Sequence, residues 1–121
     1  MNIKIFFLSI FAGILLLVSC KKGSNDSTTV QPTSFKFESL TSDAAEIVYS
    51  SNPSTKITAV ATGDGLTYQW SGTAGDILGS GSKVTYTANA FCCGGNQTIT
   101  CKVKDKYGNG DAKQVSINVR N

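Results

Sequence analysis

The spacing of apolar residues between Ser34 and Asn121 is the feature that most restricts how this chain can fold. No window of helical length there has apolar residues at positions i, i+3 and i+4, whereas apolar residues recur at every second position in short runs. Gly, Asn, Asp and Ser separate these runs, as in tight turns between strands. We therefore expect an all-β domain of about seven strands, arranged as two sheets packed face to face.

The phase of each run predicts which side chains face the interior. The expected strands lie at 35–38, 56–62, 66–70, 77–78, 84–88, 97–105 and 115–119. After a kink, Ala45 and Ile47 should continue the first strand. Strands 56–62 and 66–70 should form a hairpin, because a Thr-Gly-Asp-Gly turn joins them. The in-phase side chains expected in the core include Trp70, Tyr68, Ile99 and Val103.

The first 20 residues have the organisation of an export signal. Lys4 is followed by an apolar run from Ile5 to Val18 that only small residues interrupt. This run is shorter than the roughly 20 apolar residues that a transmembrane helix needs. Its last four residues, Leu17-Val18-Ser19-Cys20, resemble the lipobox of bacterial lipoproteins. The alternative is an ordinary secretory signal with an incidental cysteine.

The lipobox resemblance implies a cellular location and a domain organisation. Residues 1–19 would be a signal peptide that is removed, and Cys20 would be acylated and anchored in a membrane of the bacterial cell envelope. The outer membrane is expected, with the protein facing either the periplasm or the cell surface. Residues 20–33 contain one aliphatic side chain and no periodicity, which predicts a flexible tether. The folded domain would then span residues 34–121.

Four segments of this domain resemble one family when taken together. They are Ile57-Thr58-Ala59-Val60-Ala61, Tyr68-Gln69-Trp70, the run from Ile99 to Asn109, and Val115-Ser116-Ile117-Asn118-Val119. The chain is similar, over residues 34–119, to bacterial immunoglobulin-like domains of the PKD type. The resemblance implies an immunoglobulin-like sandwich that acts as a spacer, adhesion or accessory binding module, often for glycans, without catalysis. The family usually has an Asp-Phe-Gly-Asp-Gly-like stretch after the tryptophan, which is absent here, so no function of that loop is implied.

Composition argues against several classes of function. The chain contains no histidine, which excludes Ser-His-Asp and Cys-His catalysis and histidine-liganded zinc. Its net charge of +3 gives no case for binding nucleic acid. The aspartates at turns lack the regular spacing of a calcium loop, so each is expected to bond its own backbone. We therefore expect no enzyme activity, no metal and no cofactor.

Aromatic residues in turns are the candidate ligand contacts. Tyr107 lies at the tip of the last hairpin and Phe91 in the loop before the penultimate strand, where side chains tend to be exposed. The alternatives are a packed turn cap for Tyr107 and a loop plug for Phe91. Trp70 and Tyr68 could also form a platform for a sugar ring, but their phase favours the core.

The cysteines of the domain are Cys92, Cys93 and Cys101, and export predicts at least one disulfide. In the immunoglobulin-like arrangement that the resemblance implies, Cys101 would take the inward position that carries half of the disulfide between the two sheets. Its counterpart in this chain is Ala59, so that disulfide cannot form. A bridge from Cys92 or Cys93 to Cys101 would staple the loop and stabilise the fold by roughly 2–3 kcal/mol. The competing arrangement is a vicinal Cys92–Cys93 bridge that leaves Cys101 buried as a small apolar side chain.

Taken together, these features predict a non-catalytic, lipid-anchored module of the cell envelope that binds a glycan or protein ligand. Its membrane contact would be the lipid anchor. The alternative is a structural spacer that holds part of a larger envelope complex.

Overall fold

Two four-stranded β-sheets form the folded part of the chain. The protein is described from a computed structural model, which covers residues 31–89 and 93–121. Within these residues, the compact unit Gln31–Asn121 contains eight strands. They are β1 (Lys36–Ser42), β2 (Glu46–Val48), β3 (Ser54–Thr62), β4 (Thr67–Gly72), β5 (Asp76–Leu78), β6 (Lys83–Thr87), β7 (Gly95–Lys104) and β8 (Gly110–Arg120).

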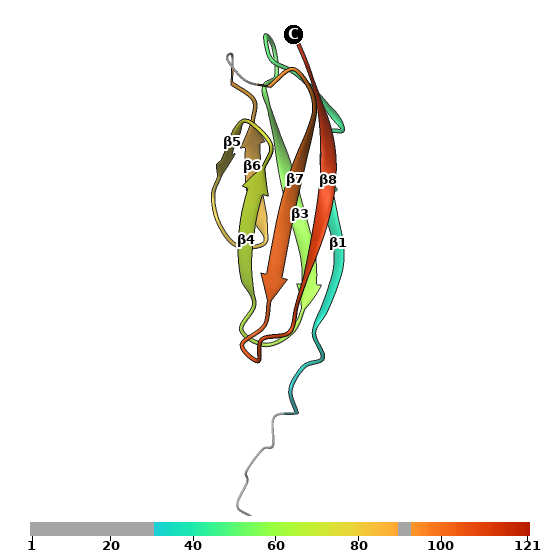
Figure 1. Cartoon of the computed structure of the whole chain (residues 1–121), viewed down its shortest axis with the longest axis vertical. Coiled ribbons are helices and arrows are strands. Elements are labelled where there is room, and N and C mark those ends of the chain that lie inside the picture. The colour runs from blue at the N-terminus through green and yellow to red at the C-terminus, as the bar shows by residue number, and fades with distance from the viewer. Residues whose placement is uncertain (1–30, 90–92) are drawn as a thin grey trace, which may run out of the picture. The chain divides into compact units, whose positions relative to one another are not determined.

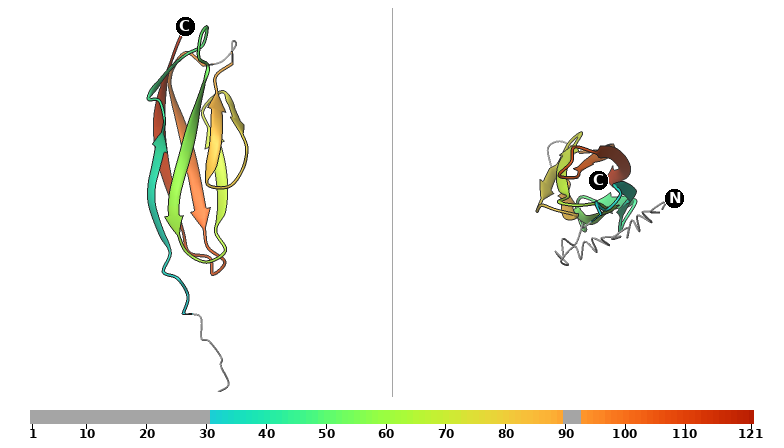
Figure 2. Two further views of the ribbon diagram at one scale, coloured as in Figure 1. Left: turned by 180° about the vertical axis from the view of Figure 1, so that it is seen from behind. Right: turned by 90° about the horizontal axis from the view of Figure 1, so that it is seen from below.

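The strands are divided evenly between the sheets, which pack face to face (Figures 1 and 2). The first sheet has the order β1-β3-β6-β5 and the second has the order β2-β8-β7-β4. Neighbouring strands are antiparallel, except that β2 runs parallel to β8. The predicted all-β sandwich is confirmed.

The hairpin predicted for 56–62 and 66–70 is wrong. These segments correspond to β3 and β4, and they belong to different sheets: β3 pairs with β1 and β6, whereas β4 pairs with β7. The turn between them contains two glycines with positive φ, Gly63 and Gly65, and carries the chain from one sheet to the other. The apolar faces of β3 and β4 can therefore face each other across the interior instead of lying side by side.

The segment around Ile47 also differs from expectation. It does not continue β1 but forms β2, which pairs with β8 in the opposite sheet. The Asn118 amide donates to the Ala45 carbonyl at 2.8 Å, where this pairing begins. Ile47 is thereby buried in the same cluster as Ile117 and Val119. Burial against the second sheet thus determines where this short segment pairs.

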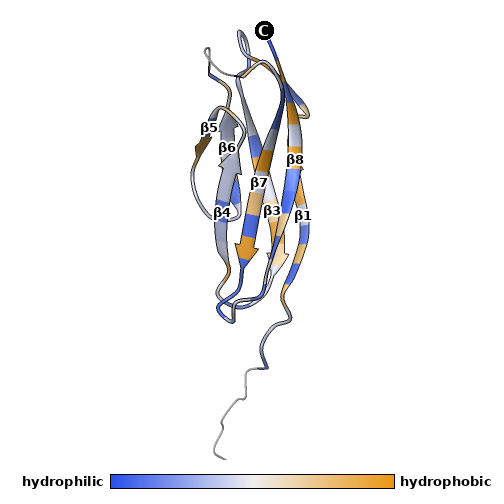
Figure 3. Cartoon of the chain, in the orientation of Figure 1, coloured by the Kyte–Doolittle hydropathy of each residue, from blue (hydrophilic) through white to orange (hydrophobic). Residues whose placement is uncertain are grey.

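Apolar side chains fill the space between the sheets. Figure 3 shows the alternation of polar and apolar residues as bands along β7 and β8. Ile99, Cys101 and Val103 of β7 are fully buried. Trp70 and Tyr68 of β4 are half-buried, and Trp70 packs against both core clusters. The Trp70 Nε1–H donates to the Gly81 carbonyl at 2.9 Å, so its polar atom is satisfied at the edge of the core.

The expected signal peptide, Cys20 and most of the expected tether lie outside the described residues. Within 31–89 and 93–121, the search for helices long and apolar enough to cross a membrane found none.

Candidate functional site

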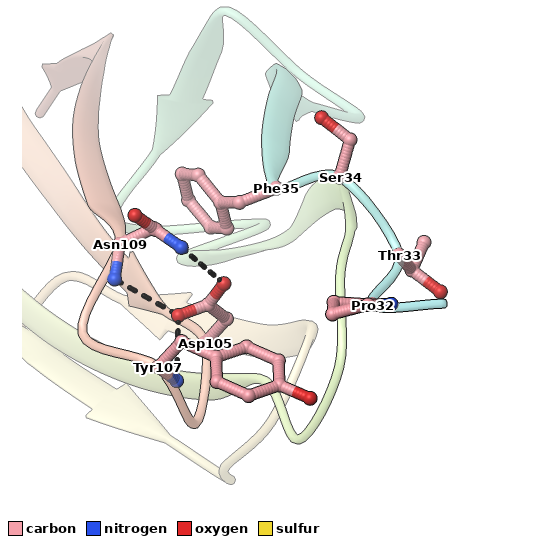
Figure 4. A pocket seen from close by; sticks show the side chains of 7 residues that line it. All are labelled: Pro32, Thr33, Ser34, Phe35, Asp105, Tyr107 and Asn109. Carbon is pink, nitrogen blue, oxygen red and sulfur yellow. Dashed lines mark hydrogen bonds between the residues drawn. The ribbon is translucent and has the colours of Figure 1, made fainter. Parts of the chain in front are cut away.

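The turn between β7 and β8 is organised around one carboxylate, that of Asp105. Its Oδ1 accepts hydrogen bonds from the backbone amides of Tyr107 and Asn109, both at 2.9 Å. Its Oδ2 accepts a hydrogen bond from the Asn109 Nδ2 at 2.8 Å (Figure 4). The expectation that a turn aspartate bonds its own backbone is confirmed at this position, and the turn is fixed by its own side chains.

The same contacts determine the charge of Asp105. The residue is only 7% exposed, and this burial favours the protonated form. Hydrogen bonds from the Asn109 side chain and from the Asn109, Tyr107 and Gly108 backbones favour the ionised form and prevail, so the pKa of Asp105 is lowered. A general acid at neutral pH needs a raised carboxyl pKa, and Asp105 has the opposite shift. The role of Asp105 is therefore to shape the turn.

Tyr107 projects from this turn, with 54% of its surface exposed. The Lys106 Nζ lies 5.0 Å from the centre of its ring, within the range of a cation–π interaction. An exposed aromatic ring held next to a cation can stack on a sugar ring or receive an apolar group from a protein surface.

A hollow of about 400 Å³ lies beside Tyr107. Its volume is near the lower end of the range for small-molecule sites. One wall comes from the β7–β8 turn and the other from the segment before β1, as the close view in Figure 4 shows. The lining residues are Pro32, Thr33, Ser34, Phe35, Asp105, Tyr107 and Asn109.

Asp64 holds the two walls of this hollow in place. Its carboxylate accepts a hydrogen bond from the Thr33 amide at 2.9 Å, and its backbone carbonyl accepts one from the Lys106 amide at 2.9 Å. Pro32 and Thr33, the last residues of the expected tether, therefore help to form the site. The sequence analysis does not identify Phe35 and Asn109 as site residues. For Asn109, a signal was available: it lies in the same turn as Asp105, four residues later.

Of the two aromatic candidates, the structure describes Tyr107. Phe91 lies outside the described residues. Tyr107 is therefore the candidate whose surroundings can be described.

The predicted bridge from the loop to Cys101 is wrong, because Cys101 is a buried free thiol in the structure. The strand β7 is already extended at Gly95, so six residues at about 3.3 Å each separate this position from Cys101. A disulfide requires Cα atoms within about 7 Å of each other. Cys93 packs in a different core cluster from Cys101. A Cys92–Cys93 bridge stays a prediction, because Cys92 lies outside the described residues.

Burial also explains the chemistry of Cys101. It packs with Phe37, Ala59 and Val103, and desolvation raises the pKa of its thiol to about 11. Such a thiol is un-ionised at neutral pH and is a poor nucleophile.

In the part of the chain that the structure describes, no group of three or more Asp, Glu, His or Cys residues could hold a metal ion. No protein family, curated protein or solved structure matches this chain.

Proposed function

We propose that this protein is a non-catalytic, lipid-anchored module of the bacterial cell envelope that binds a glycan or protein ligand. The observation on which this rests is the exposed Tyr107 ring beside the hollow formed by the β7–β8 turn and the segment before β1. The polar atoms of Asp105 are occupied in shaping this turn, which favours recognition over chemistry.

We further propose that the sandwich is immunoglobulin-like and of the PKD type. The order β1-β3-β6-β5 corresponds to strands A, B, E and D of an immunoglobulin sandwich, and β8-β7-β4 corresponds to G, F and C. The motif resemblance over residues 34–119 supports the finer family. In this scheme Trp70 lies on strand C, and Cys101 and Ala59 lie on strands F and B.

The proposed anchor follows from the lipobox-like segment ending at Cys20. Three acyl chains would hold a protein on a bilayer essentially permanently, whereas one chain binds only marginally. Mass spectrometry of the native protein tests this directly: an acylated Cys20 at the N-terminus is expected. The Cys20→Ala variant should no longer be held on the membrane. The anchor would be contradicted if Cys20 of the native protein carried no acyl mass, or if the wild-type protein were already free of the membrane.

The ligand-binding proposal is tested with the full chain in detergent on a glycan array and in pull-downs from envelope extracts. Tyr107→Ala should reduce binding of any ligand found by at least about tenfold, as for an aromatic hot spot. Tyr49→Ala is the matched control, because Tyr49 is another exposed tyrosine, 38% accessible, outside the hollow. Equal effects of the two variants would show that the hollow is not the contact surface.

The second candidate is a structural spacer. It is favoured by the engagement of both Asp105 oxygens within the turn, which leaves the hollow with few groups that could discriminate among ligands. Two variants separate the spacer from the binding module. The spacer is supported if the Tyr107→Ala variant keeps the function of the protein in the cell envelope and a variant without residues 34–121 loses it.

A further inference from the structure

The four outermost strands of the two sheets differ in how well their edges are protected. A free edge has unpaired N–H and C=O groups that can pair with another chain, and proteins block it with charges, bulges or very short strands. The edge strands are β1, β2, β4 and β5. β2 and β5 have three residues each and include Glu46 and Asp76. β1 has Lys36 and Glu38 and a register shift between Phe37 and Ser39.

β4 has none of these protections. Its sequence Thr-Tyr-Gln-Trp-Ser-Gly contains no charge and no proline, and its pairing with β7 is regular over all six residues. Two parts of the other sheet lie beside β4: the loop at Gly81, whose carbonyl accepts a hydrogen bond from Trp70 Nε1, and the strand β5, which follows β4 in the chain. β4 is therefore the edge of this sandwich best suited to accept another strand.

The hydrogen-bond phase shows which residues face this open edge. The Thr73 amide donates to the Thr98 carbonyl, just beyond β4 and in the same register. Alternate pairs in an antiparallel ladder are hydrogen-bonded, so Thr67, Gln69 and Ser71 bond to β7. The backbone N–H and C=O groups of Tyr68, Trp70 and Gly72 must then point away from β7. Backbone bonds from these groups to other described elements are absent.

The side chains around this edge indicate what kind of strand would fit. On one face, Tyr68 and Trp70 are only half-buried, so part of each residue remains accessible. On the other face, exposed Lys102 and Lys104 of β7 lie directly across from Gln69 and Thr67. These two lysines line, with Thr67, Tyr68 and Gln69, a hollow of about 320 Å³.

Charge complementarity selects among the possible occupants. Within the described part of the chain, neither Lys102 nor Lys104 forms an ion pair. A strand added beside β4 would lie about 10 Å from β7, a distance that lysine and glutamate side chains can span together. Pairing of β4 with β4 of a second copy would supply no acidic group, because β4 and β7 contain no Asp or Glu.

We propose that the free edge of β4 binds an extended segment of another protein by β-strand addition, and that this segment alternates apolar and acidic side chains. Backbone hydrogen bonds to Tyr68, Trp70 and Gly72 would provide the affinity, and alternate side chains would provide the selectivity. This site is separate from the hollow beside Tyr107, so either proposal can fail without the other.

The test uses the full chain in detergent and short blocked peptides of alternating Val and Glu. Trp70 is the only tryptophan in the sequence, so its fluorescence reports on the edge directly. Binding should change this fluorescence and slow amide exchange at Tyr68, Trp70 and Gly72. A peptide of the same sequence with N-methyl groups on alternate residues, which cannot complete the ladder, should not bind.

Two double variants separate the charge effect from a general change in net charge. Lys102→Glu with Lys104→Glu should weaken binding of the Val-Glu peptide by about tenfold and favour a Val-Lys peptide instead. Lys56→Glu with Lys83→Glu, at exposed positions on the first sheet, should leave binding unchanged. The proposal is overturned if the peptide does not bind, or if it binds without protecting the three amides from exchange. It is also overturned if the two double variants have equal effects, or if self-association protects these amides when no peptide is present.

Discussion

Asp105 and Tyr86 are both buried polar residues, near opposite ends of the sandwich, but their surroundings differ completely. Asp105 accepts three hydrogen bonds through its side chain within its turn. The Tyr86 hydroxyl is fully buried and has no hydrogen-bond partner among the described residues. Burial, together with the nearby Asp76 carboxylate, raises the pKa of Tyr86. Asp105 therefore stabilises the fold through its polar atoms, whereas Tyr86 stabilises it through its ring alone.

The largest effect is expected at Gly75, which packs against Tyr86. A Cβ atom at this position would lie 2.7 Å from the Tyr86 hydroxyl and 2.8 Å from the Thr87 carbonyl, and the residue has a φ of +89°. Gly75→Ala should therefore lower the free energy of unfolding by about 3 kcal/mol, measured by chemical denaturation.

Gly81→Ala is the matched control for this substitution. Gly81 has a φ of +77°, but nothing lies within 4 Å of the place that a Cβ atom would occupy. It should lose only the cost of the backbone conformation, about 1 kcal/mol. Equal losses for the two variants would mean that crowding around Tyr86 contributes nothing.

The next largest effect is expected for Asp105→Asn, which removes the charged acceptor of the β7–β8 turn. Because the pKa of Asp105 is lowered in the folded protein, its contribution to stability is complete above the ordinary carboxyl pKa, about 4. That contribution is lost as the pH falls through the lowered value. The melting temperature of Asp105→Asn should therefore be lower than that of the wild type at pH 7, and the two should converge in acid.

Asp111→Asn serves as the control for charge alone. Asp111 is exposed, and its side chain accepts one hydrogen bond, from the Ala112 amide. Its substitution should change the melting temperature little at any pH. A wild-type advantage over Asp105→Asn that persists unchanged below pH 3 would contradict the role assigned to the ionised carboxylate.

A smaller loss of stability is expected for Cys101→Ser, which would bury a second unpaired hydroxyl in addition to that of Tyr86. Cys101→Ser introduces a polar atom among Phe37, Ala59 and Val103, and it should cost about 1–2 kcal/mol. Cys101→Ala, which adds no polar group, should be less destabilising. Denaturation curves of the two variants provide the comparison, and equal stabilities would show that this part of the core tolerates a hydroxyl.

The smallest effect is expected for Tyr86→Phe, which keeps the ring and removes the unpaired hydroxyl. Stability should stay the same or rise, by less than about 1 kcal/mol, because no hydrogen bond is lost. Calorimetry of the variant against the wild type measures this difference. A clear loss of stability would indicate that the hydroxyl has a partner, such as a bound water molecule.

The inward faces of the strands could be predicted from the sequence because alternation is a local property. Val84 and Tyr86, like Ile99 and Val103, are buried as their phase predicts. Strand pairing is not local in this way. The turn after Thr62 has the composition of a hairpin, yet it joins two sheets, because the choice depends on which faces can bury each other.

The candidate site was predictable only in part for the same reason. Tyr107 was found because a turn composition predicts exposure. The opposing wall, from Pro32 to Phe35, could not be found, because it is distant in sequence and Asp64 brings it into place. The predicted disulfide to Cys101 rests on export, on a short loop and on the inward phase of Cys101. It does not take account of the start of β7 at Gly95, which separates the cysteines.

The placement of β1 and β2 in different sheets has a mechanical consequence. The stretch from Lys36 to Val48 is hydrogen-bonded first to β3 and then, in parallel, to β8. Suppose that force is applied to the segment before β1 and to Arg120. Because β2 and β8 are parallel, the force would pull these two strands past each other along their length. The hydrogen bonds between them would then be loaded in shear and would break together, not one after another. Under flow or traction, the domain should therefore resist forced unfolding, which depends on the unfolding rate and not on equilibrium stability.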